Sequence, residues 1–220
     1  MHAAGTERRR NTPLASPCSA AVLALVLALA AVLAPAPTLA TAQRDAELGP
    51  ILRQAITHQG CDDHPDHFDE EVFFKLHEPR LRRLVQEPQR RIAILQSVYC
   101  ETHRVKRRYR DEKRFELRMT PELVLAVMDV ESRFDPYAVS SAGAVGLMQV
   151  MPFWPRELGV ENRLFGSIDF NVRLGVEILA YYMHKERNDH VRALGRYNGS
   201  LGRRKYPDLV LGRLNARWGS

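Results

Sequence analysis

The sequence predicts a mainly α-helical protein. Apolar residues recur at intervals of three and four in several segments, which is the pattern of a helix that buries one face. Thr120-Pro121-Glu122 is typical of a helix start: a hydroxyl cap, a proline in the first turn and an acid near the positive end of the helix dipole. No segment alternates apolar and polar residues convincingly enough to predict a strand.

The composition is that of a globular protein. The chain has 220 residues, of which 45% are hydrophobic and 26% charged. This length suits one domain with extensions and is sufficient to bury a core.

The first 42 residues differ from the rest and predict a cleaved secretory signal. Arg8, Arg9 and Arg10 precede an unbroken apolar run over 20–33, and Ala40-Thr41-Ala42 is a small-x-small cleavage pattern. The run is shorter than the roughly 20 residues that span a bilayer, so we favour a signal peptide over an uncleaved anchor. The expected mature chain starts close to Gln43, is periplasmic and has no stable membrane span.

The route of export follows from the residues around the apolar run. Cys18 lies before the run and so cannot be the lipid-bearing cysteine of a lipoprotein. Arg8-Arg9 hints at the twin-arginine route, but Asn11-Thr12-Pro13 is not its apolar continuation. We therefore favour the general secretory route.

The net charge is only mildly positive. Removing 1–42 takes away three arginines and one glutamate, which lowers the formal charge from +6 to +4. This balance favours proximity to an anionic polymer or membrane surface but predicts no nucleic-acid partner. The basic run 104–114 has two readings, a solvated helix face or strap, and a docking patch for an acidic polymer.

Two cysteines remain after the predicted cleavage, Cys61 and Cys100. In an oxidising compartment they invite a disulfide, and two separately buried thiols are the alternative. Cys61, His64 and His67 have a spacing of interest for a metal, but no distant His or Cys pair completes a site. We therefore predict no metal.

Three helical segments are expected before residue 119. The first lies within 43–60, the second opens at Asp69 and Glu70, and the third covers 89–107. Their apolar positions near helical spacing are Leu48, Ile51, Leu52, Ala55 and Ile56; Val72, Phe73, Leu76, Leu81, Leu84 and Val85; and, on one stripe, Ile92, Leu95, Val98 and Tyr99.

The C-terminal half is expected to be helical as well. The helix that starts at Thr120 must end by Pro136, because Asp135-Pro136 disfavours continuation. Further helices are expected over 172–185 and from about Val191, with loops at 136–146 and 155–170.

Glu131 is the candidate catalytic residue. It follows the apolar run 123–130, and a carboxyl that faces a cleft at the end of such a helix loses solvation. Because desolvation disfavours the charged form, its pKa rises and it can donate a proton near neutral pH.

The stretch that follows Glu131 is suited to an extended ligand. Small residues over 140–146 let a ligand approach backbone N–H and C=O groups. Met148 and Gln149 then offer an apolar wall and an amide for an acetamido group. Together these features favour a sugar polymer as the ligand.

These residues resemble the soluble lytic murein transglycosylase domain. The pattern ES-x-F-x-P-x-A-x-S-x-x-GA-x-GLMQ-x-MP is met over 131–152. A downstream segment with Asn171 and Gly175 and the stretch RYNGS at 196–200 are similar to two further family motifs. Gly199-Ser200 departs from the small residue and glycine that follow this Tyr-Asn pair in many members.

The resemblance covers about 119–210 and implies a lysozyme-like, mainly helical domain. It implies cleavage of the β-1,4 bond between N-acetylmuramic acid and N-acetylglucosamine, with no cofactor. Glu131 is then the lone catalytic acid and afterwards the base, and the product is a 1,6-anhydro sugar. Tyr197 is expected to hydrogen-bond near Glu131. The expected substrate-binding residues are Ser140, Gly146, Met148, Gln149, Tyr197 and Asn198.

A glycosidase of the ordinary kind needs two carboxylates that flank the bond. The candidates are Asp135, Glu161 and Asp169, and Asp135 is better suited to forming the Asp-Pro turn. The absence of an obvious second acid agrees with the intramolecular route. It leaves open hydrolysis by a distantly held water, as in goose-type lysozymes.

The predicted organisation is a signal peptide at 1–42, a helical segment of unassigned role at 43–118 and a lysozyme-like domain at 119–220. The leading functional prediction is a peptidoglycan lytic transglycosylase acting on glycan strands. The alternatives are a lysozyme-type hydrolase, a wall-binding module without chemistry, and an interaction protein that docks an envelope partner through 43–118. Glu131 argues against a pure binder, which needs no acid there.

Overall fold

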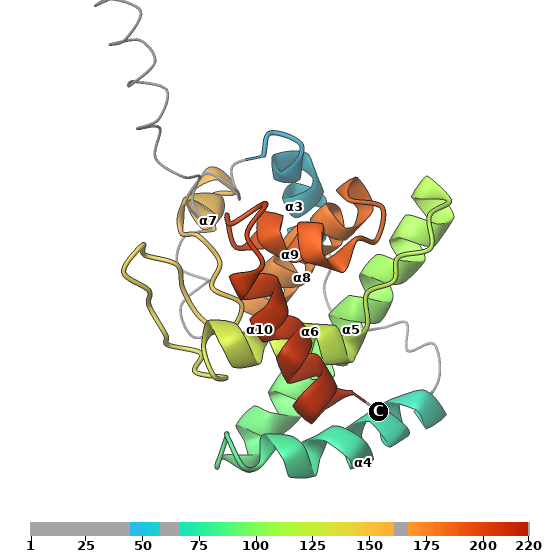
Figure 1. The fold of residues 1–220 in the computed structure, drawn as a ribbon, viewed down its shortest axis with the longest axis vertical. Helices are drawn as coiled ribbons and strands as arrows, with labels where there is room; N and C mark the ends of the chain where they lie inside the picture. Colours follow the sequence, from blue (N-terminus) through green and yellow to red (C-terminus); the bar gives the residue numbers. More distant parts are fainter. Residues whose placement is uncertain (1–44, 58–66, 161–166, 220) are drawn as a thin grey trace, which may run out of the picture. The chain divides into compact units, whose positions relative to one another are not determined.

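The computed structural model describes residues 45–57, 67–160 and 167–219 (Figure 1). The predicted signal peptide, Cys61, His64 and Glu161 lie outside these ranges. The described residues are mainly helical, as the sequence predicts, and their only β-pairing is in isolated bridges of Val145 with Val139 and Val150. The helices are α3 (Leu48–Thr57), α4 (His67–Leu81), α5 (Pro88–Lys113), α6 (Pro121–Glu131), α7 (Phe153–Glu157), α8 (Ile168–Lys185), α9 (His190–Tyr197), α10 (Lys205–Arg213) and the π-helical turn η2 (Leu214–Trp218).

Side-chain caps set where the central helices begin. Thr120 accepts a hydrogen bond from the backbone N–H of Leu123, and Pro121 opens α6, which confirms the predicted start. Ser167 caps α8 through the N–H of Phe170, and Asp189 caps α9 through that of Arg192. The sequence therefore fixes these starts locally.

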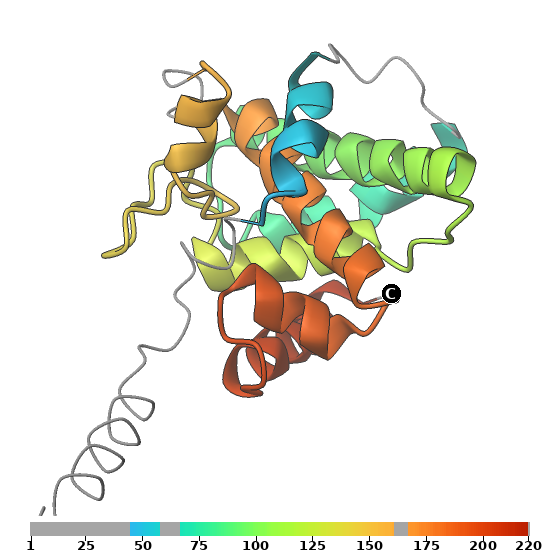
Figure 2. The same ribbon diagram turned by 90° about the horizontal axis from the view of Figure 1, so that it is seen from above.

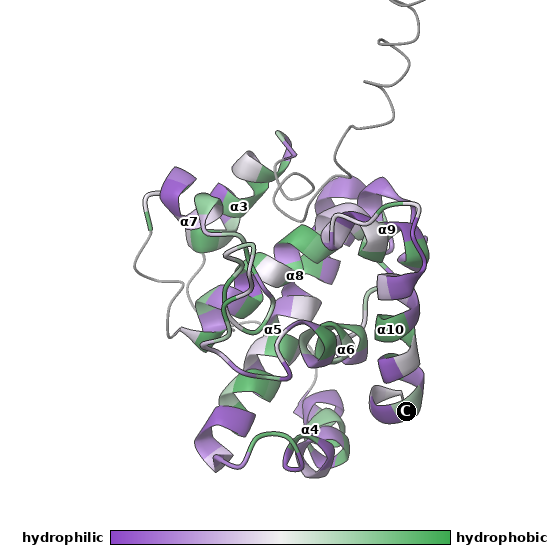
Figure 3. Cartoon of the chain, turned by 60° about the vertical axis from the view of Figure 1, so that its left-hand side comes forward, coloured by the Kyte–Doolittle hydropathy of each residue, from purple (hydrophilic) through white to green (hydrophobic). Residues whose placement is uncertain are grey.

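Helices α6 and α8 form the interior of the described fold. α8 packs against α3, α5 and α9, while α6 packs against α5, α10 and η2 (Figures 1 and 2). Eight of the eleven residues of α6 are buried, and Figure 3 shows its hydrophobic residues inside the fold. Leu48 and Leu52 of α3 are fully buried in the same core cluster as α6. The helices before residue 119 thus share their core with those after it.

Helix α5 departs from the predicted register and length. Ile92 was expected on the buried stripe, but it is 50% exposed, and the stripe begins at Ile94 instead. The helix also continues to Lys113, beyond the predicted end at 107. The reason is that charged side chains near the C-terminal end of α5 bind buried carboxylates. A prediction from the spacing of apolar residues cannot detect such contacts.

Those partners form an ion-pair network between α5 and α8. Glu177 is fully buried on α8 and binds Arg104 at 2.7 Å and Arg108 at 2.6 Å. Glu101 pairs with Arg104 and with Arg173, each at 2.7 Å. Part of the basic run 104–114 therefore joins two helices, which favours the strap over the docking patch.

Of the two loops predicted in the C-terminal half, one is present and the other overlaps two helices. The loop predicted over 136–146 is present, but the one predicted over 155–170 includes the end of α7 and the start of α8. The sequence interpretation also missed α10 and η2. None of the helices in the described ranges combines the length and apolar character needed to cross a bilayer.

Candidate active site

The carboxyl of Glu131 ends α6 and meets a phenol from α10. The hydroxyl of Tyr206 donates a hydrogen bond of 2.6 Å to Oε1 of Glu131. Burial raises the pKa of Glu131 to about 7, and the bond from Tyr206 opposes this rise. The carboxyl also lies at the negative end of the α6 dipole, which disfavours its charged form. The direction of this pKa shift is the one that the sequence predicts for a desolvated carboxyl.

The residues after Glu131 tie the end of α6 to the loop beyond it. Ser132 Oγ lies 3.0 Å from the carbonyl oxygen of Leu147 and accepts a hydrogen bond of 3.1 Å from the N–H of Phe134. Arg133 and Phe134 both have positive φ, at 53° and 66°. This left-handed pair turns the chain sharply, so that the loop folds back beside Glu131.

The opposite face of α6 is held by the C-terminal turn. Asp129 Oδ2 accepts hydrogen bonds from Arg217 Nη1 at 2.7 Å and from the indole Nε1 of Trp218 at 3.0 Å. Trp218 is fully buried and packs edge-on against Phe134. α6 is therefore fixed on the face opposite to the Glu131 carboxyl, and this support was not predicted from the sequence.

The loop over 138–150 is closed by its own backbone and two polar side chains. Ser140 Oγ accepts the N–H of Ala144 at 3.0 Å. Asn171 on α8 accepts the N–H of Met148 and donates to the carbonyl of Val145, both at 2.9 Å. The sequence motif thus includes Asn171 as the residue that fastens this loop to α8.

Gly146 is required where the loop passes over Asn171. Its φ is 77°, and a Cβ there would lie 2.5 Å from Asn171 Nδ2. Its N–H donates to the carbonyl of Ala138 at 2.8 Å. Glycine at this position is explained by the close approach of the loop to α8.

Met148 and Gln149 lie elsewhere than expected. Met148 is fully buried against Gly175, and Gln149 is 3% exposed, with Nε2 donating to the carbonyl oxygens of Ala138 and Gly146. Their burial does not support the predicted apolar wall and free amide for a sugar. In the structure both side chains shape the loop, because the chain folds over them.

Two tyrosines lie near Glu131, and they have different hydrogen-bond partners. The hydroxyl of Tyr197 donates to the carbonyl of Met148 at 2.6 Å, although Glu131 is near enough to contribute, after burial, to raising the Tyr197 pKa. The donor to Glu131 is Tyr206, which the sequence interpretation missed. A signal was present, since Tyr206, Val210 and Leu214 recur at intervals of four. Asn198 lies at the C-terminal cap of α9 and is partly exposed.

The two candidate second carboxylates within the described residues, Asp135 and Asp169, have structural partners. Asp135 Oδ1 accepts the N–H of Tyr137 at 2.9 Å, which confirms its predicted role in the turn. Asp169 accepts a hydrogen bond from Ser97 at the start of α8. The pKa of Glu131 is set by burial and by the Tyr206 hydroxyl, and neither Asp135 nor Asp169 contributes to it. Within those residues no three His, Cys, Asp or Glu side chains gather as a metal site.

Cys100 is disulfide-bonded. Its partner lies outside the described residues, where both other cysteines of the chain are found. The pairing with Cys61 therefore stays a prediction.

This arrangement defines a helical protein with one desolvated carboxyl set to exchange a proton near neutral pH. Comparison with known families gives the particular class: residues 109–208 match the transglycosylase SLT domain. The family resemblance and the helical fold expected from the sequence are thereby confirmed.

Similar proteins share short segments with this chain. Membrane-bound lytic murein transglycosylase C of Actinobacillus pleuropneumoniae serotype 5b (strain L20) is 66% identical over 32 residues, 14% of this chain and 9% of the relative. That of Haemophilus ducreyi (strain 35000HP / ATCC 700724) is 63% identical over 48 residues, 21% of this chain and 13% of the relative.

A longer match is to membrane-bound lytic murein transglycosylase F of Desulfosudis oleivorans (strain DSM 6200 / JCM 39069 / Hxd3). It is 34% identical over 87 residues, 37% of this chain and 19% of the relative. The chain thus spans less than a fifth of the length of each of these relatives. No solved structure matches the chain.

Proposed function

We propose that the protein is an exported peptidoglycan lytic transglycosylase. It cleaves the β-1,4 bond between N-acetylmuramic acid and N-acetylglucosamine and leaves a 1,6-anhydro end. The observation that carries this proposal is the desolvated Glu131 carboxyl, bonded to Tyr206 and with a pKa of about 7. The SLT domain match and the names of the relatives support the same substrate.

Glu131 acts twice in the proposed reaction. Its protonated form gives the proton to the glycosidic oxygen as the bond from that oxygen to the anomeric carbon breaks. The C6 hydroxyl oxygen of the muramic residue then bonds to the anomeric carbon, and its proton passes to the Glu131 carboxylate. The acid is restored and no water is consumed. A pKa near neutrality suits both steps, because neither protonation state is strongly favoured.

The remaining site residues support the position of Glu131. Tyr206 holds one carboxyl oxygen, and Asp129 anchors the other face of α6. The partly exposed Ser140 and Asn198 are proposed to meet the sugar, while the buried Gly146 lets the loop pass close to Asn171 of α8. Met148, Gln149 and Tyr197 shape this surface from beneath, since their side chains are buried.

The test is the identity of the released sugars. Purified wall digested by the protein should give muropeptides that end in 1,6-anhydromuramic acid, lighter by one water than a lysozyme product. Reducing-end sugars as the main product would identify the alternative, a lysozyme-type hydrolase. Mass analysis separates the two outcomes.

Glu131→Gln tests the assignment of the acid. The amide keeps the shape of the side chain but cannot transfer the proton, so activity should fall at least about 10²–10⁴-fold while wall binding persists. Asp135→Asn is the matched control and should leave the product unchanged. Unaltered activity in Glu131→Gln would overturn the assignment. Wall binding without cleavage by the unmodified protein would identify a binding module.

We further propose that the protein acts in the cell envelope, as a periplasmic chain without residues 1–42. The basic, apolar and small-residue order at its N-terminus supports this, as do the names of the membrane-bound relatives. N-terminal sequencing of the protein from the envelope fraction should give a start close to Gln43. A chain that retains 20–33 would be an anchored protein instead.

The segment 43–118 is proposed to be a helical cap on the catalytic domain. Its helix α5 packs on α8 and α6, and its α3 packs on α8. A partner-docking role through the same segment is the alternative, and capture by an envelope protein that is lost on changing its exposed residues would favour it.

A further inference from the structure

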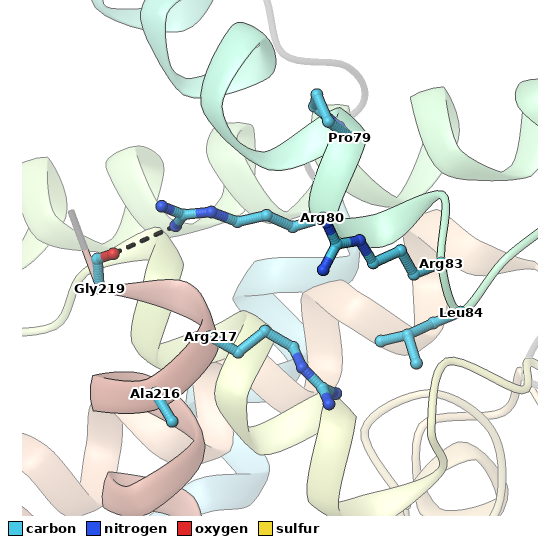
Figure 4. Close-up of a pocket in the computed structure, with 7 residues that line it drawn as sticks. All are labelled: Pro79, Arg80, Arg83, Leu84, Ala216, Arg217 and Gly219. Atoms are coloured by element: carbon cyan, nitrogen blue, oxygen red, sulfur yellow. Dashed lines mark hydrogen bonds between the residues drawn. The ribbon is translucent and has the colours of Figure 1, made fainter.

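A pocket lined by arginines lies between α4 and the C-terminal turn η2. It has a volume of about 380 Å³ and opens to solvent. Figure 4 shows Arg80 and Arg83 reaching it from the α4 side and Arg217 from η2. Its other lining residues are Pro79, Leu84, Ala216 and Gly219.

The positive charge in this pocket is only partly balanced by nearby carboxylates. None of its lining residues is acidic. Arg80 donates to two carbonyl oxygens, of Trp218 at 3.3 Å and of Gly219 at 3.1 Å, which orient its guanidinium without neutralising it. Arg83 is exposed, and the carboxylate of Glu78 pairs with Arg82 and Arg91 instead. Arg217 alone has a carboxylate partner, Asp129.

The same contacts hold the pocket ready for a ligand. Arg80 and Arg217 are fixed from opposite sides, one by the backbone of the C-terminal turn and one by buried Asp129. A guanidinium presents N–H donors in a fork that matches a carboxylate. Pro79, Leu84 and Ala216 add an apolar wall beside these donors. The pocket therefore combines an anion site with room for a small apolar group.

We propose that this pocket binds the terminal carboxylate of a short peptide that ends in alanine. The inference rests on the proposed function, because peptidoglycan strands carry peptides with free carboxylates and small methyl side chains. The volume is near the lower end for ligand pockets, which fits a peptide end rather than a sugar chain. The pocket lies on the face of α6 that carries Asp129, opposite to the Glu131 carboxyl. A peptide bound there would therefore attach the wall to the protein at a place other than the catalytic acid.

Binding is tested with N-acetyl-D-alanyl-D-alanine and its C-terminal amide as probes. In nuclear magnetic resonance titrations of the purified protein, the amide signals of Ala216 and Gly219 should shift and saturate with the acid. The neutral amide should leave them unchanged, because it lacks the charge that the arginines recognise. Equal shifts with both probes, or no saturation with the acid, would overturn the proposal.

Arg83→Gln is the informative variant, since Arg83 supports no contact within the fold that its loss would break. Loss of a hydrogen bond to a charged group should weaken binding of the acid by about tenfold or more. Arg203→Gln, a change of another exposed arginine, should leave it unaltered. Unchanged affinity in Arg83→Gln contradicts the assignment. Inorganic phosphate that saturates the same signals at equal concentration would show a general anion site and refute the peptide.

Two further measurements separate this proposal from the catalytic one. Glu131→Gln should bind the acid probe as the unmodified protein does, because Glu131 lies outside the pocket. Arg83→Gln should still form 1,6-anhydro ends. If peptide binding is observed but no anhydro product forms, the catalytic proposal fails and the pocket stands. If anhydro product forms without peptide binding, the pocket proposal fails and the catalytic proposal stands.

Discussion

Glu131 and Tyr206 are 75 positions apart in sequence and share a hydrogen bond of 2.6 Å. The bond favours the charged carboxylate, whereas burial favours the neutral acid, and burial dominates. Tyr206 itself is buried, and its pKa lies well above its ordinary value because of that burial and the adjacent Glu131. The phenol therefore remains a donor throughout the range in which Glu131 titrates.

Activity should fall as the pH rises through about 7. The first step uses the protonated form of Glu131, and this form disappears above its pKa of about 7. In Tyr206→Phe the carboxylate loses its hydrogen bond, so the pKa of Glu131 should rise and the alkaline limb should move to higher pH. Rates of release of anhydro ends, measured from pH 5 to 9, check this. An alkaline limb at the same pH in both proteins would mean that a group other than Glu131 causes the loss of activity.

Glu131→Gln should stabilise the protein at alkaline pH. The folded-state pKa of about 7 exceeds the ordinary value of 4.5, so the unmodified protein loses stability as the pH rises from about 4.5 through 7. The glutamine has no such charge to desolvate. The variant should therefore gain up to about 3 kcal/mol in unfolding free energy at pH 8, and little at pH 4. Urea unfolding at both pH values measures the difference, and an equal effect at the two would refute the explanation.

The helices of the fold were largely predictable because local signals set them. Caps at Thr120 and apolar periodicity in 172–185 required no knowledge of distant contacts. The misplaced stripe at Ile92 shows the limit, because neighbouring apolar residues compete for burial and tertiary packing decides between them. The α5 extension to Lys113 also depends on tertiary packing, because Glu177 supplies a partner to Arg108 from 69 positions away in sequence.

The sequence singled out Glu131 in the candidate active site, but not the residues that surround it. Glu131 stands out because a carboxyl ends an apolar run. Tyr206 and Asp129 do not, since their roles depend on how α10 and η2 pack against α6. Met148 and Gln149 show a second limit: the sequence does not reveal that both side chains are buried beneath the loop that they shape.

Gly175→Ala should destabilise the loop beside the active site. A Cβ at this position would lie 2.3 Å from Met148 Cβ, so the loop residue must move away from α8. Overpacking of this kind costs about 1–3 kcal/mol, and the shift should also lower activity. Gly212→Ala in α10 is the matched control, because a Cβ there meets nothing within 4 Å and should be neutral or slightly stabilising. Thermal unfolding and wall digestion of both variants test the contrast, and equal behaviour would contradict it.

Glu177→Gln should destabilise the protein far more than the loss of a carboxylate charge on the surface. Glu177 is fully buried and binds Arg104 and Arg108, so removing its charge leaves Arg108 without its carboxylate partner and Arg104 with Glu101 alone inside the α5–α8 contact. Breaking a buried pair from one side costs about 3–5 kcal/mol, because the remaining charge keeps its desolvation penalty. Glu71→Gln is the matched control: Glu71 pairs with Lys75 at 2.7 Å on an exposed helix face, where such pairs contribute about 0–1 kcal/mol. Urea unfolding should separate the two variants clearly. A cost for Glu177→Gln no larger than that for Glu71→Gln would mean that the network contributes nothing to holding α5 on α8.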